Sequence, residues 1–344
     1  MTWTDFLQTQ GASQDGRNFG KLALELEDAR SATIVAPLTD LGVIAVNGED
    51  AVPFLNNMLT NDIKSLASVG ACLGGLCNPK GRLLATMNIW RTDQGLCLAL
   101  SADLLAAIQK KLAMYVMRSK VQLNDETQLT LLLGLSGPKA ALALSGLGVD
   151  IGSTAKLRKF PDGEVIHLGG DRYLLAVCAQ RAEETWKQLT KIASPVGLDA
   201  WHWLEIVAGI PCITAKLQEE FVPQMINYDR IGGVSFSKGC YPGQEIVARS
   251  QYLGKIKRHM YRVFAADEAR ELQAGAELYS SSTPDQPCGM VVQAAPSPVG
   301  GTEALAVLQS SCFEAGDLHL GSLGGPVLRF LPLPYAHHTE PENS

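Results

Sequence analysis

One segment of the chain concentrates residue types that could do chemistry. The motif KGCYPGQE places the thiol of Cys240 two residues after the amine of Lys238, followed by Gln244 and Glu245, with Arg249 four residues further on. A nearby positive charge lowers the pKa of a thiol, and the thiolate is the form that attacks electrophiles and binds metals. This spacing favours a reactive Cys240. The alternative interpretation is a tight glycine-rich turn around a half-buried cysteine.

Other features of the segment leave its chemistry open. A Cys–His dyad would need His202 or His259, and sequence alone places neither beside Cys240. GCYPG is not a nucleophile elbow, because the candidate nucleophile is its second residue rather than its third. The local positive charge indicates a site for a carboxylate- or phosphate-bearing ligand or for RNA, or else a solvated strand edge. Between Lys238 and Arg262 Glu245 is the only acid, and the basic residues are Lys238, Arg249, Lys255, Lys257, Arg258 and Arg262.

A second candidate cluster is the segment CNPKGR. Asn78 and Pro79 followed by Gly81 are typical of a turn, which would expose Lys80 and Arg82 at the tip of a hairpin. The chain contains no Walker A motif, no GxGxxG fingerprint, no HExxH and no CxxC pair. The standard nucleotide-binding, zinc-protease and preformed zinc or cluster sites are therefore unsupported.

Alternating strands and helices must position these segments. Over about 200 residues, strand-like apolar runs alternate with segments that have the apolar periodicity of a helix, which predicts an α+β body. Ser101 is the expected N-cap of one helix, and QEIVAR could begin a helix or a strand. After residue 255, short strand candidates separated by Gly, Pro and Ser predict a small all-β barrel or sandwich. The clearest predicted elements are helices over 21–30, 51–59, 105–115 and 182–192 and a hairpin over 82–100.

Composition excludes several protein classes. With 344 residues, 46% of them hydrophobic, the chain can bury two or three sizeable cores and is not a disordered protein. A net charge of −6 argues against a general nucleic-acid coat protein. Its apolar stretches are too short to span a membrane, and the N-terminus lacks signal-peptide features. Eight cysteines without a disulfide-like pattern indicate a reduced, cytoplasmic protein.

The motif KGCYPGQE resembles the KGCYxGQE signature of the YgfZ family of folate-binding, iron–sulfur-related proteins. Weaker matches follow in the same order, and the resemblance covers residues 33–331. These matches are Phe54-Leu55 with Leu59-Thr60-Asn61-Asp62, the NPKGR turn at 78–82, AGIP at 208–211 and FVPQ at 221–224.

This resemblance implies a fold. The YgfZ family shares its architecture with the T-protein of glycine cleavage, an aminomethyltransferase that uses tetrahydrofolate. It implies an α+β protein of three domains around a central folate cavity, with a C-terminal β-barrel. The predicted organisation is an N-terminal extension over 1–32, a folate-binding region of two intertwined α+β subdomains over 33–254, a β-barrel over 255–331 and a loose tail over 332–344.

The chain departs from related proteins at informative positions. T-proteins carry an acidic pair, one member of which is catalytic, where this chain has Leu84 and Ala85. Neither side chain accepts a proton, so aminomethyl transfer by that mechanism is disfavoured. At the position of Val207 many relatives have a glutamate, whose carboxylate suits the N–H groups of a pterin. If successive residues alternate in a strand, Glu205 would lie on the same face as Val207 and partly replace that glutamate. A folate-contacting tryptophan of enterobacterial relatives aligns with Leu41.

The resemblance also assigns candidate roles. Trp201 matches a tryptophan with which the family contacts folate, and an aromatic ring suits a flat pterin. We expect tetrahydrofolate or folate as the cofactor and no permanently bound metal. The candidate folate-binding residues are Asn61, Asp62, Lys80, Arg82, Trp201, Glu205 and Tyr241. The candidate reactive site consists of Cys240 with Lys238, Gln244, Glu245 and Arg249.

Three functions remain to be distinguished. The first is a folate-binding accessory protein for the assembly, repair or activity of iron–sulfur enzymes, including radical enzymes that modify tRNA, with Cys240 as the key residue. The second is a tetrahydrofolate-dependent aminomethyl or one-carbon transferase, which the missing acidic pair opposes. The third is a module that binds tRNA directly through the basic zone at 249–262, which the acidic pI of about 5.6 opposes.

Overall fold

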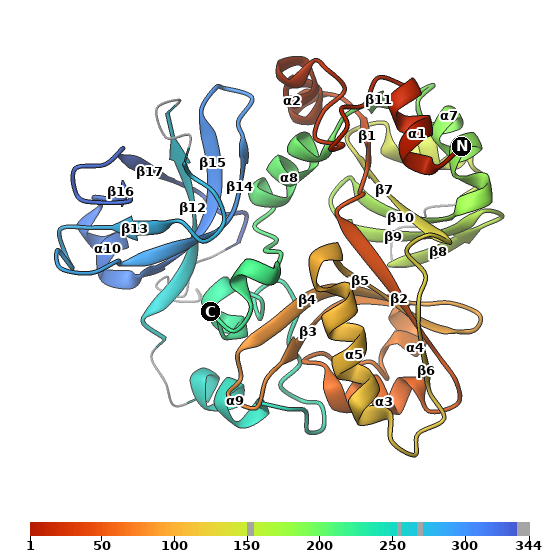
Figure 1. Cartoon of the computed structure of the whole chain (residues 1–344), viewed down its shortest axis with the longest axis horizontal. Helices are drawn as coiled ribbons and strands as arrows, with labels where there is room; N and C mark the ends of the chain where they lie inside the picture. Colours follow the sequence, from red (N-terminus) through yellow and green to blue (C-terminus); the bar gives the residue numbers. More distant parts are fainter. Residues whose placement is uncertain (150–154, 253–255, 267–270, 336–344) are drawn as a thin grey trace.

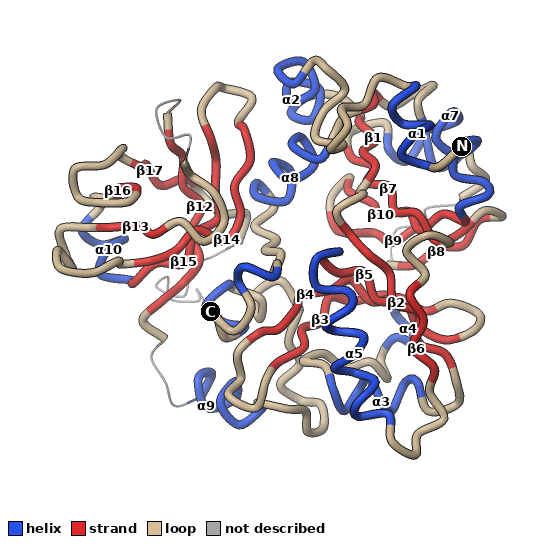
Figure 2. The backbone as a smooth tube through the Cα atoms, in the orientation of Figure 1, coloured by secondary structure: helices blue, strands red, loops and turns tan. Residues whose placement is uncertain are grey.

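The computed structural model describes residues 1–149, 155–252, 256–266 and 271–335. Its strands form three sheets, with helices packed around and between them (Figure 1). The third sheet, from the last part of the chain, lies to one side of the other two in this view. Figure 2 shows how helix α8 (Leu198–Val207) occupies the space between the C-terminal sheet and the rest.

The first sheet contains β1 (Ile34–Pro37), β7 (Thr130–Ser136), β8 (Leu157–Phe160), β9 (Gly163–Gly169), β10 (Arg172–Cys178) and β11 (Ser194–Pro195). Their order is β11-β1-β7-β10-β9-β8, and only β1 and β11 pair in parallel. Alternate side chains point to opposite faces of a strand. Val35, Leu133 and Leu175 therefore join one buried cluster, with helices α1 (Trp3–Thr9), α6 (Ala140–Gly146) and α7 (Ala182–Leu189), whereas Leu132 and Leu174 join the central one.

The second sheet contains β2 (Leu41–Asn47), β3 (Ala71–Cys77), β4 (Leu83–Arg91), β5 (Gly95–Ser101) and β6 (Gln122–Asp125). Its order is β3-β4-β5-β2-β6, and every pairing is antiparallel. Around it lie α3 (Ala51–Met58), α4 (Leu66–Val69) and α5 (Leu105–Val116), and on α5 the buried stripe is Leu105, Ile108 and Leu112.

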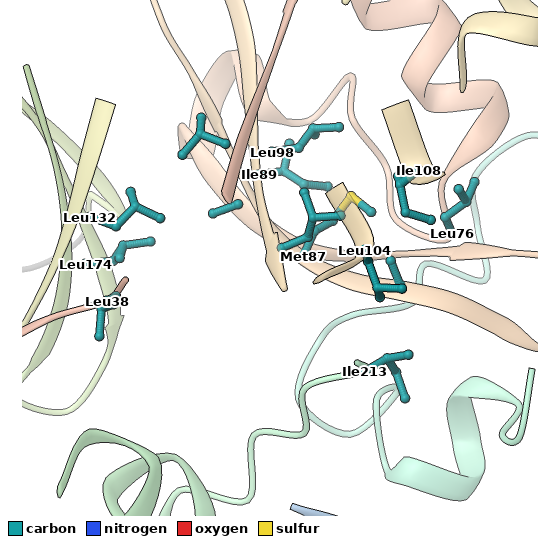
Figure 3. Close-up of a cluster of buried hydrophobic side chains, with 14 of the residues drawn as sticks. Leu38, Leu76, Met87, Ile89, Leu98, Leu104, Ile108, Leu132, Leu174 and Ile213 are labelled. Carbon is teal, nitrogen blue, oxygen red and sulfur yellow. The ribbon is translucent and has the colours of Figure 1, made fainter. Parts of the chain in front are cut away.

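The central hydrophobic cluster joins these two sheets. On one side lie Leu132 and Leu174 of the first sheet and Leu38, the residue that follows β1. On the other side lie Met87 and other side chains of the second sheet (Figure 3). The chain leaves the first sheet after β1, builds the whole second sheet and returns at β7. The two sheets therefore share one core rather than forming two separate ones.

Helix α8 is held at its N-terminal end by the first residues of the chain. Helix α2 (Leu22–Ser31) packs against α8, and its buried Glu25 accepts a 2.9 Å hydrogen bond from the amide of Gly197. Arg17 forms a 2.5 Å ion pair with Asp199. Because these contacts fix the start of α8, they also fix the side chains that the helix directs inward.

The third sheet runs β16-β13-β14-β15-β12-β17 and is antiparallel and strongly curled. It forms a half-barrel, and a bridge between His319 of β16 and Val327, just before β17, connects its two edge strands. Buried Glu303 connects this sheet to α8: it accepts hydrogen bonds from the indole of Trp203 at 3.0 Å and from Arg262. The elements are β12 (Arg258–Ala265), β13 (Glu277–Tyr279), β14 (Gly289–Pro296), β15 (Thr302–Gln309), α10 (Ser310–Ala315), β16 (His319–Leu320) and β17 (Leu328–Leu331).

The structure confirms the predicted α+β class, the helices near 21–30, 51–59, 105–115 and 182–192 and the change to a mostly β-strand region after residue 255. The expected shortness of those strands is wrong for β12, β14 and β15, which have eight residues each. Ser101 stands at the N-cap of the short 3₁₀ turn that leads into α5, but the expected capping hydrogen bond is wrong, because its hydroxyl makes none. Of the predicted tail, Tyr335 donates a 2.8 Å hydrogen bond to the carbonyl of Gly209, and residues 336–344 lie outside the described residues. Within the described ranges, no helix has the length and apolar character needed to cross a bilayer.

Candidate functional site

A cavity lies between the three sheets, along one face of α8. Its larger part, about 540 Å³, has polar walls from Arg17, Asp40, His202, Glu205 and Lys216 and apolar walls from Leu41 and Trp201. A narrow part of about 60 Å³ leads past Leu41, Trp201 and Glu205 to a second part of about 330 Å³. Glu205 lines all three parts. The second part is bounded by Cys72, Asn88, Lys156, His167, Arg172 and neighbouring apolar residues.

The secondary structure at Glu205 differs from the expectation. Residues 198–207 form a helix, so Glu205 and Val207 do not share a face as they would in a strand. Instead, Glu205 lies one helical turn after Trp201, and both line the cavity. The strand-based reason was wrong, but the helix still brings the two predicted folate-binding residues together.

Arg172 links these two residues. Its guanidinium forms an ion pair with Glu205 and lies 5.3 Å from the centre of the Trp201 ring. The side chains of Arg172 and Glu205 are 12% and 18% exposed, so this pair is largely removed from water. Burial raises the pKa of Glu205, and the positive charges of Arg172 and His202 partly offset that effect.

The Trp201 ring is already enclosed. It is 4% exposed and rests on β7 at Gly134, where an added Cβ would lie 2.6 Å from the ring atoms. A larger residue than glycine would therefore displace the indole. Trp201 forms part of the cavity wall beneath Arg172, rather than an open platform.

Asp40 and His202 form a second polar pair in the cavity. The Nε2 atom of His202 lies 2.7 Å from a carboxylate oxygen of Asp40. Burial lowers the pKa of His202, but the hydrogen bond and charge of Asp40, with Glu205 and Asp199 nearby, raise it overall. Neither Asp40 nor Arg172 was a sequence candidate, because pairs separated by 162 and 33 residues leave no spacing signal.

The second candidate region is the Cys240 segment, residues 235–243. Cys240 itself is exposed and does not belong to the walls of the cavity described above. Lys238 points inward, donating to the carbonyls of Asn56 and, at 2.7 Å, Leu59 at the end of α3. Its ammonium also lies 4.8 Å from the centre of the buried Tyr241 ring. Lys238 and Tyr241 thus anchor the segment and leave the thiol outside.

The Asn78–Arg82 turn lies directly against this segment. At Gly243, with φ +81°, an added Cβ would be 2.4 Å from the carbonyl oxygen of Asn78 and 2.7 Å from the Gly81 backbone. At Gly81 it would be 3.0 Å from Ile246. Two glycines thereby allow backbone contact between two motifs that are about 160 residues apart in the chain.

The other predicted residues have structural partners. Arg82 donates to the carbonyls of Glu219 and Glu220, and Lys80 is exposed beside it. Asn61 donates 2.7 Å hydrogen bonds to the carbonyls of Leu73 and Gly232. The folate assignments at these positions, and at Asp62 and Tyr241, gain no direct support from this placement.

Helix α9 (Gln244–Tyr252) follows the Cys240 segment. It carries Gln244, Glu245 and Arg249, of which Glu245 and Arg249 are exposed. The buried amide of Gln224, from the FVPQ motif, holds this helix by donating a 2.7 Å hydrogen bond to the Val247 carbonyl. Across the described residues, no three His, Cys, Asp or Glu side chains are grouped as a metal site.

Comparison with known proteins shows which family the chain belongs to. The profile of the GCVT N-terminal domain family matches residues 6–234. A protein of Serratia proteamaculans named tRNA-modifying protein YgfZ is 30% identical over 322 residues, which span 89% of this chain and 95% of the relative. The protein of the same name from Photobacterium profundum is 29% identical, over 93% of this chain and 96% of the relative. The chain belongs to the YgfZ family.

The YgfZ chain also shares its fold with a solved enzyme. The glycine cleavage aminomethyltransferase T of Bartonella henselae superimposes with a TM-score of 0.75, with 97% of each chain covered and 19% sequence identity. That likeness supports the predicted architecture around a central cavity. In the YgfZ chain, Leu84 and Ala85 lie buried within β4, so neither contributes a carboxylate to the cavity.

Not every cation of the basic zone faces solvent. Arg262 is turned to the buried Glu303, whereas Arg249, Lys257 and Arg258 are exposed. Lys255 lies outside the described residues. The zone therefore has fewer exposed cations than the sequence alone indicates.

The pKa of Lys238 gives a testable pH dependence. Burial lowers this pKa to about 8, whereas an unfolded lysine titrates near about 10.4. Between these values the folded chain binds fewer protons than the unfolded chain, so Lys238 favours folding increasingly as pH rises. We expect the free energy of unfolding of the wild type to rise, relative to Lys238→Met, between about pH 8 and 10. Urea unfolding at several pH values measures this difference, and parallel curves would contradict it.

Proposed function

We propose that this YgfZ-family chain binds a reduced folate in its central cavity and supports iron–sulfur enzymes that modify tRNA through its Cys240 segment. The relatives from Serratia proteamaculans and Photobacterium profundum are named tRNA-modifying proteins. The observation that carries the folate part is the pairing of Trp201 and Glu205 on one face of α8, where both line the same cavity.

The cavity suits a folate in size and chemistry. Small-molecule sites usually have volumes of about 300–1,000 Å³ with apolar walls and a few polar groups, and the two main parts of this cavity measure about 540 and 330 Å³. The Glu205 carboxylate has acceptor capacity for the N–H groups of a pterin beyond its bond to Arg172. Lys216 adds positive charge for the carboxylates of the glutamyl tail, whereas Arg17 on the same wall is already paired with Asp199. A bound reduced folate would supply a carrier for one-carbon units.

The role of the Cys240 segment follows from exposure and anchoring. The thiol faces solvent, while Lys238 and Tyr241 hold the backbone on either side of it. One cysteine cannot hold an iron–sulfur cluster alone, because such clusters need several thiolates. A transient contact with a partner protein, in which Cys240 supplies one thiolate, fits this arrangement.

An aminomethyltransferase activity is disfavoured. The cavity contains Glu205 and Asp40, but Arg172 and His202 already pair with them. The positions of the acidic pair of T-proteins are filled by buried Leu84 and Ala85. An accessory function with folate as ligand agrees better with these residues than a proton-transfer mechanism at that strand.

A calorimetric titration with 5-formyltetrahydrofolate tests the folate proposal. We expect saturable binding to the wild type, and about a ten- to hundredfold weaker affinity for Glu205→Gln, because the replaced carboxylate loses charge-assisted hydrogen bonds. Trp201→Phe should also weaken binding by reducing the aromatic wall. Val207→Ala is the matched control, since Val207 lies on α8 away from the cavity. No binding to the wild type, or equal weakening by the control, would refute the proposal.

A further inference from the structure

Arg172 occupies a special position in the cavity. It begins β10 and is the one described cation in direct contact with both Glu205 and Trp201. Resting on the proposed folate function, we propose that Arg172 is the positioning residue of the folate site: it orients Glu205 as an ionised carboxylate and fixes Trp201 beside it.

The ionisation of Glu205 depends on the charged and titratable groups around it. Arg172 from β10 and His202 from α8 carry the favourable charges, and Asp40, before β2, carries an unfavourable one. Cys212 lines the same cavity, and burial and nearby carboxylates raise the pKa of its thiol, so it stays neutral. Lys156, His167 and Lys216 line the cavity as well. Without Arg172, however, His202 would be the strongest positive charge left to oppose the effect of burial and Asp40 on Glu205. The neutral carboxyl form of Glu205 would then persist to higher pH.

The geometric part concerns orientation. Arg172 donates through one Nη atom to one oxygen of Glu205, and the rest of its rigid planar guanidinium extends toward Trp201, a pair of contacts that the single ammonium of a lysine does not reproduce. The same planar group covers the indole of Trp201 at 5.3 Å. One side chain therefore sets the relative placement of the two groups proposed to meet the pterin, although it need not contact the ligand itself.

Two substitutions separate charge from geometry. Arg172→Met removes both the charge and the planar group, so folate affinity should fall. It should recover as pH rises and Glu205 ionises, and the pH at which affinity is half-maximal should be higher than in the wild type by at least about one unit. Arg172→Lys keeps the charge, so the pH profile should resemble the wild type while affinity stays lower. The double variant Arg172→Met with Glu205→Gln should lose the shifted profile, because Gln does not titrate.

Arg181→Met is the matched control. Arg181 forms ion pairs with Asp162 at 3.0 Å and Glu184 at 2.8 Å, close to the other end of β10 and outside the cavity. Removing it breaks two ion pairs that are more exposed, at the opposite end of the same strand, without touching Glu205. Its folate titration curve should therefore match the wild type at each pH.

A ligand-free measurement keeps this inference distinct from the folate proposal. Carbon NMR of the Glu205 carboxyl group follows its ionisation directly, in wild type and Arg172→Met. We expect the acid dissociation constant of Glu205 to be at least about tenfold smaller in the variant than in the wild type. An unchanged titration would overturn the inference even if folate binds. Absence of folate binding to the wild type would refute the proposed function while the NMR titration still decides the role of Arg172.

Discussion

Replacing Gly243 with alanine is expected to destabilise the protein by about 3 kcal/mol. A left-handed backbone costs an L-residue about 1–2 kcal/mol, and the added Cβ would meet the carbonyl of Asn78 at 2.4 Å. Backbone atoms cannot move aside as a flexible side chain can, so overpacking adds about 1–3 kcal/mol. The Cys240 segment and the Asn78–Arg82 turn would have to separate.

Gly232→Ala is a closely matched control for this substitution. Gly232 has nearly the same φ, +78°, but an added Cβ there meets no atom within 4 Å. Chemical unfolding of both variants therefore separates conformational strain from the clash. If Gly243→Ala costs no more than Gly232→Ala, the contact between the two motifs contributes nothing to stability.

Loss of the Cys240 thiol is expected to abolish function without affecting the fold. Cys240 is exposed, so Cys240→Ser removes no buried contact, and its unfolding free energy should equal that of the wild type. If the thiolate makes the proposed partner contact, serine cannot replace it, because a hydroxyl is a far weaker nucleophile and metal ligand at neutral pH.

The measurement is complementation of a bacterial strain that lacks its own YgfZ protein. Modified nucleosides in its tRNA, quantified by mass spectrometry, should be restored by the wild type and not by Cys240→Ser. Cys178→Ser provides the comparison, since Cys178 is also exposed but lies in the first sheet, at the end of β10. Full restoration by Cys240→Ser would eliminate the thiol from the mechanism.

The sequence predicted the local elements better than their partners. Periodicity was sufficient for α5 and α7, because an amphipathic stripe is a local pattern. It also located the Asn78–Arg82 turn through its Asn-Pro and Gly residues. It could not show that Gly81 and Gly243 bring this turn against the Cys240 segment, since that contact depends on the tertiary arrangement of distant segments.

Glu205 illustrates the same limit within the site. The residue was selected from the sequence, but on the assumption of a strand, and its actual partner Arg172 carried no recognisable signal. An isolated arginine on an apolar strand does not reveal which carboxylate it will meet. From the sequence His202 is a candidate only as a partner of Cys240, and the fold instead brings Asp40 within 2.7 Å of it.

The path of the chain between the first two sheets also constrains the order of folding. Strand β1 needs both β7 and β11, whose paired residues Ser136 and Ser194 lie about 100 and 160 positions after Ile34. The second sheet, by contrast, is complete within residues 41–125 and can form as a local unit during synthesis. The first sheet closes only after the ribosome has released β11, and α8 follows immediately. The third sheet, which also lines the cavity, is synthesised later still. The cavity walls are thus complete only at the end, so a ligand that binds between Glu205 and Trp201 would act on the final step of maturation rather than on its nucleus.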